Sequence, residues 1–293
     1  MRFIAVSKAP RKAAYRAINS VQDLMSGAVT AVLSRGIRAF RSGIDREKIQ
    51  ALLERDNVEG VYETIPWGKL GDNISGMSDQ YEQAIRRGGK IGTKFIPRVK
   101  EPELDFSPKN PRVGGWINSR TANLVQNITE DAKVAIRGAV TRALNRGINP
   151  LETAKLIPRT IGLTDRQAQA VDNFRIGLAN KLGIEGLKLE REVEKYRERL
   201  LDYRTENIAR TEIAAAFNQG QIELWEQAAE KGYLDRGSQK KQWVIDPGTA
   251  CQICEPMSGE EVLLTEQFYV EGLSQYLAAP PAHPSCNCDV VLS

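Results

Sequence analysis

The residue types best suited to metal or redox chemistry gather near the C-terminal end of the sequence. The 293-residue chain has four cysteines and one histidine, and all five lie after residue 250. In chain order they are Cys251, Cys254, His283, Cys286 and Cys288. Cysteines kept only for packing would not be confined to one stretch, so this arrangement predicts a site.

The spacing of these residues is typical of structural zinc, which takes four nitrogen or sulfur ligands. A Cys-x-x-Cys turn brings two thiolates to one ion, and Cys286 and Cys288 point to the same side of an extended strand. Five candidate ligands leave two sets open: four cysteines, or three cysteines with His283. In the first set His283 caps a turn or hydrogen-bonds to a ligand sulfur. Reduced cysteines that merely pack a small sheet are the alternative without a metal.

No catalytic constellation accompanies the cluster. A zinc deaminase needs a His-x-Glu motif before its cysteine pair, but the chain has no histidine before His283. A Gly-x-x-x-x-Gly-Lys loop and a Gly-x-Ser-x-Gly elbow are also absent from the sequence. Glu255, directly after Cys254, is the one carboxylate beside the pair. We therefore expect no enzyme activity.

Composition indicates a globular protein made in a reducing compartment. Hydrophobic residues make up 41% and charged residues 27% of the chain, which is ordinary for a soluble protein. No apolar run approaches the roughly 18 residues that cross a bilayer, and no secretory signal follows the basic N-terminus. We expect synthesis in a reducing cytoplasm, where clustered cysteines favour metal binding over disulfides.

Charge is distributed unevenly along the chain. Residues 1–50 carry a net charge of +7, whereas residues 244–293 carry −7 and contain no lysine or arginine. Such polarity suggests that the two ends have different neighbours, although two solvated faces without a partner would look the same.

The N-terminal basic residues lie on a predicted helix over residues 10–42. Such a helix is able to contact nucleic acid, a partner helix or a membrane surface, or simply to face water. Membrane binding is the least favoured of these, because the apolar face is rich in alanine and valine. The candidate DNA or partner contacts are Arg11, Lys12, Arg16, Arg35, Arg38 and Arg41.

Apolar residues at a period near 3.6 predict helices through most of the remaining chain. Asp45 and Ser78 are expected N-caps, Thr164 and Gln167 form a capping-box pair, and Pro158 and Gly232 are expected stops. These helices are predicted over residues 45–55, 78–87, 116–147, 150–158, 164–182, 187–203 and 205–231.

A change to a period of two predicts strands at residues 242–245, 262–264 and 289–292. Three short strands bury little core of their own, so a bound metal ion would help to stabilise such a module. The fold class expected is therefore α+β, predominantly α-helical. Long helices precede a small C-terminal antiparallel β module that carries the Cys/His cluster.

Glycines and prolines crowd residues 88–115 and predict an extended connector. This connector is either an arm that lies on a partner or a plain linker. The chain is expected to divide into a basic helical N-terminal region, the connector, a helical domain, and a Cys/His-containing β module packed with the preceding helices. Their predicted bounds are 1–90, 91–115, 116–232 and 233–293.

One predicted helix contains the sequence Ile-Ala-Arg-Thr-Glu, with Arg210, Thr211 and Glu212 as its polar residues. Residues i and i+2 of a helix point about 200° apart, so Arg210 and Glu212 need separate partners. A buried arginine favours a carboxylate, and a buried glutamate needs donors of its own. An ordinary exposed pair of charges is the alternative.

Two distant blocks together resemble the phage Mu F-like minor head proteins, also called head morphogenesis proteins. The first block is the Ile-Ala-Arg-Thr-Glu helix. The second runs from Trp243 and Asp246 through the Cys-x-x-Cys pair to the His-Pro-x-Cys-x-Cys end. The resemblance covers about residues 116–292. It departs from the family pattern at Asn287, where arginine is expected between the last two cysteines.

The resemblance implies a structural component of the virion, in the capsid interior or at the portal vertex. Its partners would be the portal protein or the major capsid protein, with no membrane, and it would assist head assembly and DNA packaging or delivery. Some members touch packaged DNA. A virion protein that binds double-stranded DNA through the basic N-terminal helix is the alternative, with salt-sensitive binding as its signature.

Overall fold

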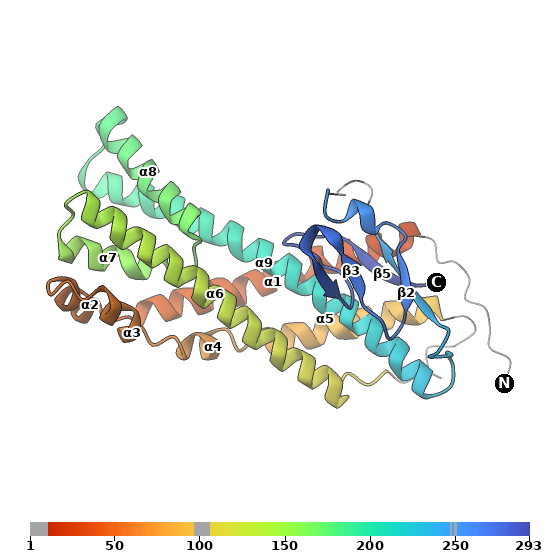
Figure 1. Cartoon of the computed structure of the whole chain (residues 1–293). Helices are drawn as coiled ribbons and strands as arrows, with labels where there is room; N and C mark the ends of the chain where they lie inside the picture. The colour runs from red at the N-terminus through yellow and green to blue at the C-terminus, as the bar shows by residue number, and fades with distance from the viewer. Residues whose placement is uncertain (1–10, 97–105, 247, 249–250) are drawn as a thin grey trace. The chain divides into compact units, whose positions relative to one another are not determined.

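The computed structural model describes residues 11–96, 106–246, 248 and 251–293, with side chains described from residue 16 onward. The chain is mostly helical with a small antiparallel β region at its C-terminal end (Figure 1), which confirms the predicted fold class. Within the described residues, no helix combines the length and the apolar character of a membrane span.

Nine α-helices and five strands make up the described part of the chain. The helices are α1 (Arg11–Ser42), α2 (Arg46–Leu53), α3 (Val58–Thr64), α4 (Lys69–Asn73), α5 (Met77–Gly92), α6 (Pro111–Asn145), α7 (Pro150–Thr160), α8 (Asp165–Leu182) and α9 (Gly186–Glu230). The strands are β1 (Lys240–Val244), β2 (Glu261–Leu263), β3 (Phe268–Val270), β4 (Gln275–Leu277) and β5 (Asp289–Leu292).

The chain forms two compact units, each assembled from separated segments. Unit 1 comprises the described parts of Met1–Val29, Ser78–Asn118 and Glu206–Ser293, and unit 2 comprises Thr30–Met77 and Ser119–Thr205. Helices α1, α6 and α9 each contribute residues to both units. These units therefore differ from the four consecutive regions expected from the sequence.

The predicted connector is wrong at both of its ends. Helix α5 continues to Gly92, and α6 begins already at Pro111. Glycine is needed within α5 because a Cβ at Gly88 would collide with the carbonyl oxygen of Phe217 in α9. Pro111 is tolerated because the first turn of a helix leaves its N–H groups unpaired. Residues 97–105 of the predicted connector lie outside the described residues.

Several helix limits were misjudged, whereas most caps are confirmed. Helix α9 is continuous where two helices were predicted, and the Thr205 hydroxyl donates to the carbonyl oxygen of Leu201 inside it (3.0 Å). Pro158 lies within α7, since it removes only one N–H near the helix end. Asp45 caps α2. Ser78 lies inside α5 rather than capping it, and the capping box at the start of α8 forms as predicted.

Strand β1 is the centre of a three-stranded antiparallel sheet with the order β2-β1-β5. All three strands lie within a few residues of their predicted positions. The two-stranded sheet of β3 and β4 was not predicted, because three-residue strands are too short to show a period. Its Phe268 ring packs edge-on against Trp243 of β1, with ring centroids 5.3 Å apart.

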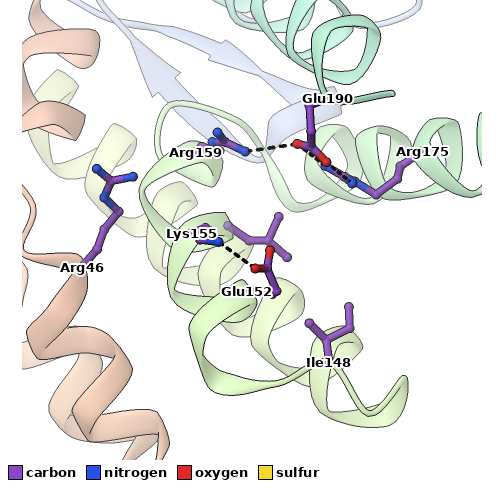
Figure 2. A pocket seen from close by; sticks show the side chains of 8 residues that line it. Arg46, Ile148, Glu152, Lys155, Arg159, Arg175 and Glu190 are labelled. Carbon is purple, nitrogen blue, oxygen red and sulfur yellow. Dashed lines mark hydrogen bonds and ion pairs between the residues drawn. The ribbon is translucent and has the colours of Figure 1, made fainter. Parts of the chain in front are cut away.

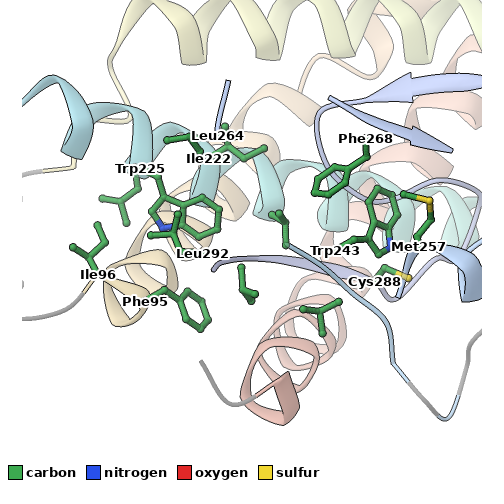
Figure 3. Packing of buried hydrophobic residues seen from close by; sticks show 14 of the residues in the cluster. Phe95, Ile96, Ile222, Trp225, Trp243, Met257, Leu264, Phe268, Cys288 and Leu292 are labelled. Atoms are coloured by element: carbon green, nitrogen blue, oxygen red, sulfur yellow. The ribbon is translucent and has the colours of Figure 1, made fainter. Parts of the chain in front are cut away.

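The core of unit 1 joins this β region to α9 (Figure 3). Trp225 of α9 is fully buried together with Trp243 and Phe268, and its indole N–H donates to the carbonyl oxygen of Gly92 (3.2 Å). The same cluster includes Cys254, Cys286 and Cys288, which line the candidate site. The C-terminal module therefore packs with preceding helices. Unit 2 has a separate core built on Ile37, Leu163, Val171, Val193 and Leu201.

Lys241 of β1 is a buried cation, with its ammonium 5.6 Å from the centre of the Phe268 ring. Burial lowers the pKa of Lys241 to about 8. Between pH 8 and 10.5 the unfolded state then binds more protons than the folded state, so this lysine costs stability below pH 8 and ceases to do so above 10.5.

We expect Lys241→Met to raise the free energy of unfolding at pH 7 by about 1 to 2 kcal/mol, and the gain to shrink as the pH approaches 10. Urea denaturation of both proteins across this range measures the difference. Lys240→Met is the matched control, because Lys240 is exposed on the same strand. A gain that is independent of pH would contradict the assigned role of Lys241.

Candidate metal centre

The five candidate ligands come together in unit 1 as two groups of three that share Cys254. Cys251, Cys254 and His283 form one group, and Cys254, Cys286 and Cys288 form the other; within each group the ligand atoms lie within 4.8 Å of one another. All four cysteines are free thiols. The cluster therefore has the ligand types and proximity to hold a metal ion, as predicted.

The separation of the Cys254 and Cys286 sulfur atoms matches that between two ligands of one tetrahedral ion. The sulfur atoms of Cys254 and Cys286 are 3.7 Å apart, against about 3.8 Å expected for two thiolates each 2.3 Å from zinc. The Nε2 atom of His283 lies 3.0 Å from the sulfur of Cys251 and 3.2 Å from that of Cys254. These are hydrogen-bond distances, shorter than the roughly 3.6 Å expected between a nitrogen and a sulfur ligand of one zinc ion.

The tautomer of His283 follows from its other nitrogen. Nδ1 lies 2.9 Å from the carbonyl oxygen of Pro284, which can only accept a hydrogen bond, so Nδ1 carries the proton. The Nε2 lone pair then faces the sulfur atoms of Cys251 and Cys254. Metal-binding histidines usually have this arrangement, with the distal N–H held by a carbonyl group.

Two tight turns position the ligands. The amide of Cys254 donates to the carbonyl oxygen of Cys251 (3.0 Å), and the amide of Cys286 donates to that of His283 (3.2 Å). Each turn presents two ligands about three residues apart. Cys288 directly precedes β5, which is buried at every position.

Hydrogen bonding among the thiols sets their protonation. The hydrogen bond between the Cys254 and Cys286 side chains lowers the pKa of Cys286 and raises the pKa of Cys254. One sulfur atom thus carries a negative charge readily, while its neighbour keeps its proton because a second charge would be close by and buried. A bound cation would favour the deprotonated form of both sulfur atoms, and its binding would release protons.

Polar residues of α9 hold the ligand-bearing loops in place. The amide of Ser285 donates to the Thr211 hydroxyl (2.9 Å), and the Ser285 hydroxyl donates to Asn207 Oδ1 (2.9 Å). The Asn218 side chain donates to the carbonyl oxygens of Pro280 (3.1 Å) and Cys288 (3.4 Å). The Ile-Ala-Arg-Thr-Glu helix and the Cys/His block are therefore in direct contact.

A buried acid adjoins the cluster on β5. The Gln221 side-chain amide donates to Asp289 Oδ1 (2.6 Å), and the amide of Val290 donates to the same atom (2.7 Å). Asp289 is fully buried, and this burial raises its pKa to about 7. Sequence reasoning missed Asn207, Asn218 and Gln221. Their signal was a row of amide side chains at helical spacing on an alanine-rich helix.

Arg210 and Glu212 have separate partners, as predicted. Arg210 donates to Asp23 Oδ1 (3.1 Å) of α1, and Glu212 accepts a hydrogen bond from the Tyr81 hydroxyl (2.7 Å) of α5. Asp246 accepts a hydrogen bond from the Asn19 side chain (3.3 Å). These residues and the fully buried Trp243 tie α1, α5, α9 and the β region together within unit 1.

The six basic residues predicted to contact DNA or a partner do not share one environment in the structure. In unit 2, Arg38 donates to Glu198 (2.7 Å) and Asp202 (2.8 Å), and Arg41 donates to Glu198 (3.0 Å) and to the carbonyl oxygen of Ile161 (2.8 Å). These two arginines thus join α1 to the part of α9 that belongs to unit 2. Arg16 and Arg35 are exposed. The side chains of Arg11 and Lys12 lie outside the described ones.

Comparison of the chain with protein-family models, with curated proteins and with solved structures gives no match.

Proposed function

We propose that this chain is a structural minor head protein of a tailed phage that works at the portal vertex. There it would assist head assembly and DNA packaging or delivery. The observation that carries the proposal is the contact between the two motif blocks. Ser285, between His283 and Cys286, bonds to Asn207 and Thr211 of the Ile-Ala-Arg-Thr-Glu helix. Two blocks that meet in space support a shared motif better than two that merely occur in order.

The Cys/His cluster in this proposal is a structural zinc site. Its sulfur and imidazole donors suit zinc, and it lies against the buried core of unit 1. Cys254 is a ligand in both remaining sets, the four cysteines and the three cysteines with His283. The His283 tautomer, which turns the Nε2 lone pair toward Cys251 and Cys254, favours the second set.

A role in fold maintenance also fits the surroundings of the cluster. Cys254, Cys286 and Cys288 are buried, and the neighbouring polar groups bond to backbone atoms of the ligand loops. A catalytic zinc ion needs an open position and a nearby general base. The ligand loops are instead packed against the core of unit 1, so we propose no enzymatic function. We also do not extend the proposal to duplex DNA, because Arg38 and Arg41 of the basic face are engaged with Glu198.

The function is tested by locating the chain in an assembled particle. We expect a symmetry-relaxed cryo-EM map of particles that contain this chain to place its helices beside the portal. The complex with the portal protein should survive high salt, because Arg38 and Arg41 are satisfied internally. Density spread over the capsid shell, or along the packaged DNA, would contradict the proposal. Loss of the chain from particles washed at high salt would favour the DNA-binding alternative.

A further inference from the structure

A charged pocket of about 560 Å³ lies in unit 2, away from the cysteines in sequence and independent of the function proposed above. Its lining comes from the start of α2, from the connection between α6 and α7, from one face of α7, and from α8 and α9 (Figure 2). The size is within the range of small-molecule sites. Its lining residues are Arg46, Ile148, Glu152, Lys155, Leu156, Arg159, Arg175 and Glu190.

The pocket carries an excess of two positive charges, with four cations against two carboxylates. Both carboxylates are already neutralised. Lys155 forms an ion pair with Glu152 (2.7 Å), and Arg175 donates two hydrogen bonds to Glu190 (2.5 and 2.8 Å). The hydrogen bond from Arg175 lowers the pKa of Glu190, so that carboxylate stays ionised.

Two guanidinium groups of the pocket make no hydrogen bond to the described residues, although Arg159 forms two longer ion pairs. Arg159 is 3.7 Å from Glu190 and 3.8 Å from Glu194, both beyond hydrogen-bond distance. Arg46 has no hydrogen bond or ion pair to any residue that the structure describes. Guanidinium N–H groups match the oxygen atoms of a phosphate group, and a phosphate bound at Arg159 would replace these longer ion pairs.

We propose that this pocket binds a phosphate monoester through Arg46 and Arg159. A monoester carries close to two negative charges at neutral pH, which matches the net charge of the lining. The volume exceeds that of a bare phosphate ion, and the side chains of Ile148 and Leu156 offer apolar contact to an organic substituent. A carboxylate carries one negative charge, which is half of the excess positive charge of the lining.

Isothermal titration of the full chain with phenyl phosphate tests the proposal, with inorganic phosphate and a short single-stranded DNA oligonucleotide as comparison probes. We expect saturable binding of phenyl phosphate that is tighter than that of the other two. Arg46→Gln and Arg159→Gln should each weaken it roughly tenfold, because each removes a charge-assisted contact. Affinity should also fall below pH 6, as the monoester takes up a proton.

Arg35→Gln is the matched control, because Arg35 is exposed in the same unit and its one hydrogen bond within the described part of the chain goes to the carbonyl oxygen of Ala31 in its own helix. It should bind phenyl phosphate as the unchanged protein does. Equal binding by Arg46→Gln, or no saturable binding of any probe, would overturn the proposal. Tighter binding of DNA would overturn the assignment to a monoester. If Arg159→Gln lowers the melting temperature, Arg46→Gln decides alone.

Discussion

Gly220→Ala is expected to lower the free energy of unfolding by about 3 kcal/mol, because α5 and α9 touch through their backbones at this point. A Cβ at Gly220 would collide with the carbonyl oxygen of Ile85, and a Cβ at Gly88 would collide with that of Phe217. The two contacts are reciprocal. A carbonyl group in a helix cannot swing aside as a side chain can, so the helices would have to separate.

The control is Gly115→Ala, in the part of α6 that belongs to the same unit. Among the described residues, and apart from its chain neighbours and the backbone of its own helix, no atom lies within 4 Å of the position that its Cβ would take. This exchange should therefore stabilise the protein by about 0.5 to 1 kcal/mol, as expected for alanine in an exposed helix. Urea denaturation of both variants measures the difference. A Gly220→Ala protein as stable as Gly115→Ala would show that α5 and α9 do not pack so closely.

The same glycines explain why the sequence misled at residues 88–92. Local propensity treats Gly88, Gly89 and Gly92 as helix breakers, and that interpretation fails once a second helix is considered. A Cβ at Gly92 would lie 2.9 Å from a methyl group of Leu224, so this glycine also allows α9 to pack closely against α5. Close approach of two backbones depends on residues more than 100 positions apart, and a local pattern does not contain it.

Helix α9 was misjudged for a different reason. Its composition changes near Thr205 from charged to alanine-rich, which suggested two helices. The change instead marks the passage of one helix from unit 2 to unit 1. Helix period and capping are local properties, so the cap at Asp45 and the capping box at Thr164 were predictable. The assignment of helix faces to two units depends on tertiary packing.

The candidate metal centre was predictable in its ligands but not in its support. Cysteine and histidine have few alternative reasons to cluster, so residue type and spacing sufficed. Asn218 and Gln221 are ordinary residues in sequence, and only the fold brings them to Cys288 and Asp289. For two basic residues of α1, the sequence suggested the wrong kind of partner. Their spacing suggested an external partner, yet Arg38 and Arg41 bond within unit 2 because Glu198 lies opposite them.

Cys254→Ser is expected to abolish zinc binding and to unfold the C-terminal β region. Cys254 is the one residue shared by both ligand groups, so its loss breaks either arrangement. Structural zinc sites contribute about 10 to 16 kcal/mol in small domains, which is comparable to the whole stability of an ordinary protein. Elemental analysis should find one zinc ion per chain in the unchanged protein and none in the variant.

Hydrogen exchange separates loss of the metal from loss of packing. In Cys254→Ser, amides of β1, β2 and β5 should lose protection, whereas α7 and α8 of unit 2 should keep theirs, since their core at Val171 contains no part of the cluster. A chelator should produce the same pattern in the unchanged protein and no further change in the variant. Thiols that only pack would make the unchanged protein insensitive to the chelator, because nothing would be removed. If the chelator lowers protection in the unchanged protein but not in Cys254→Ser, the stability of the β region comes from the metal rather than from the packing of the buried sulfur.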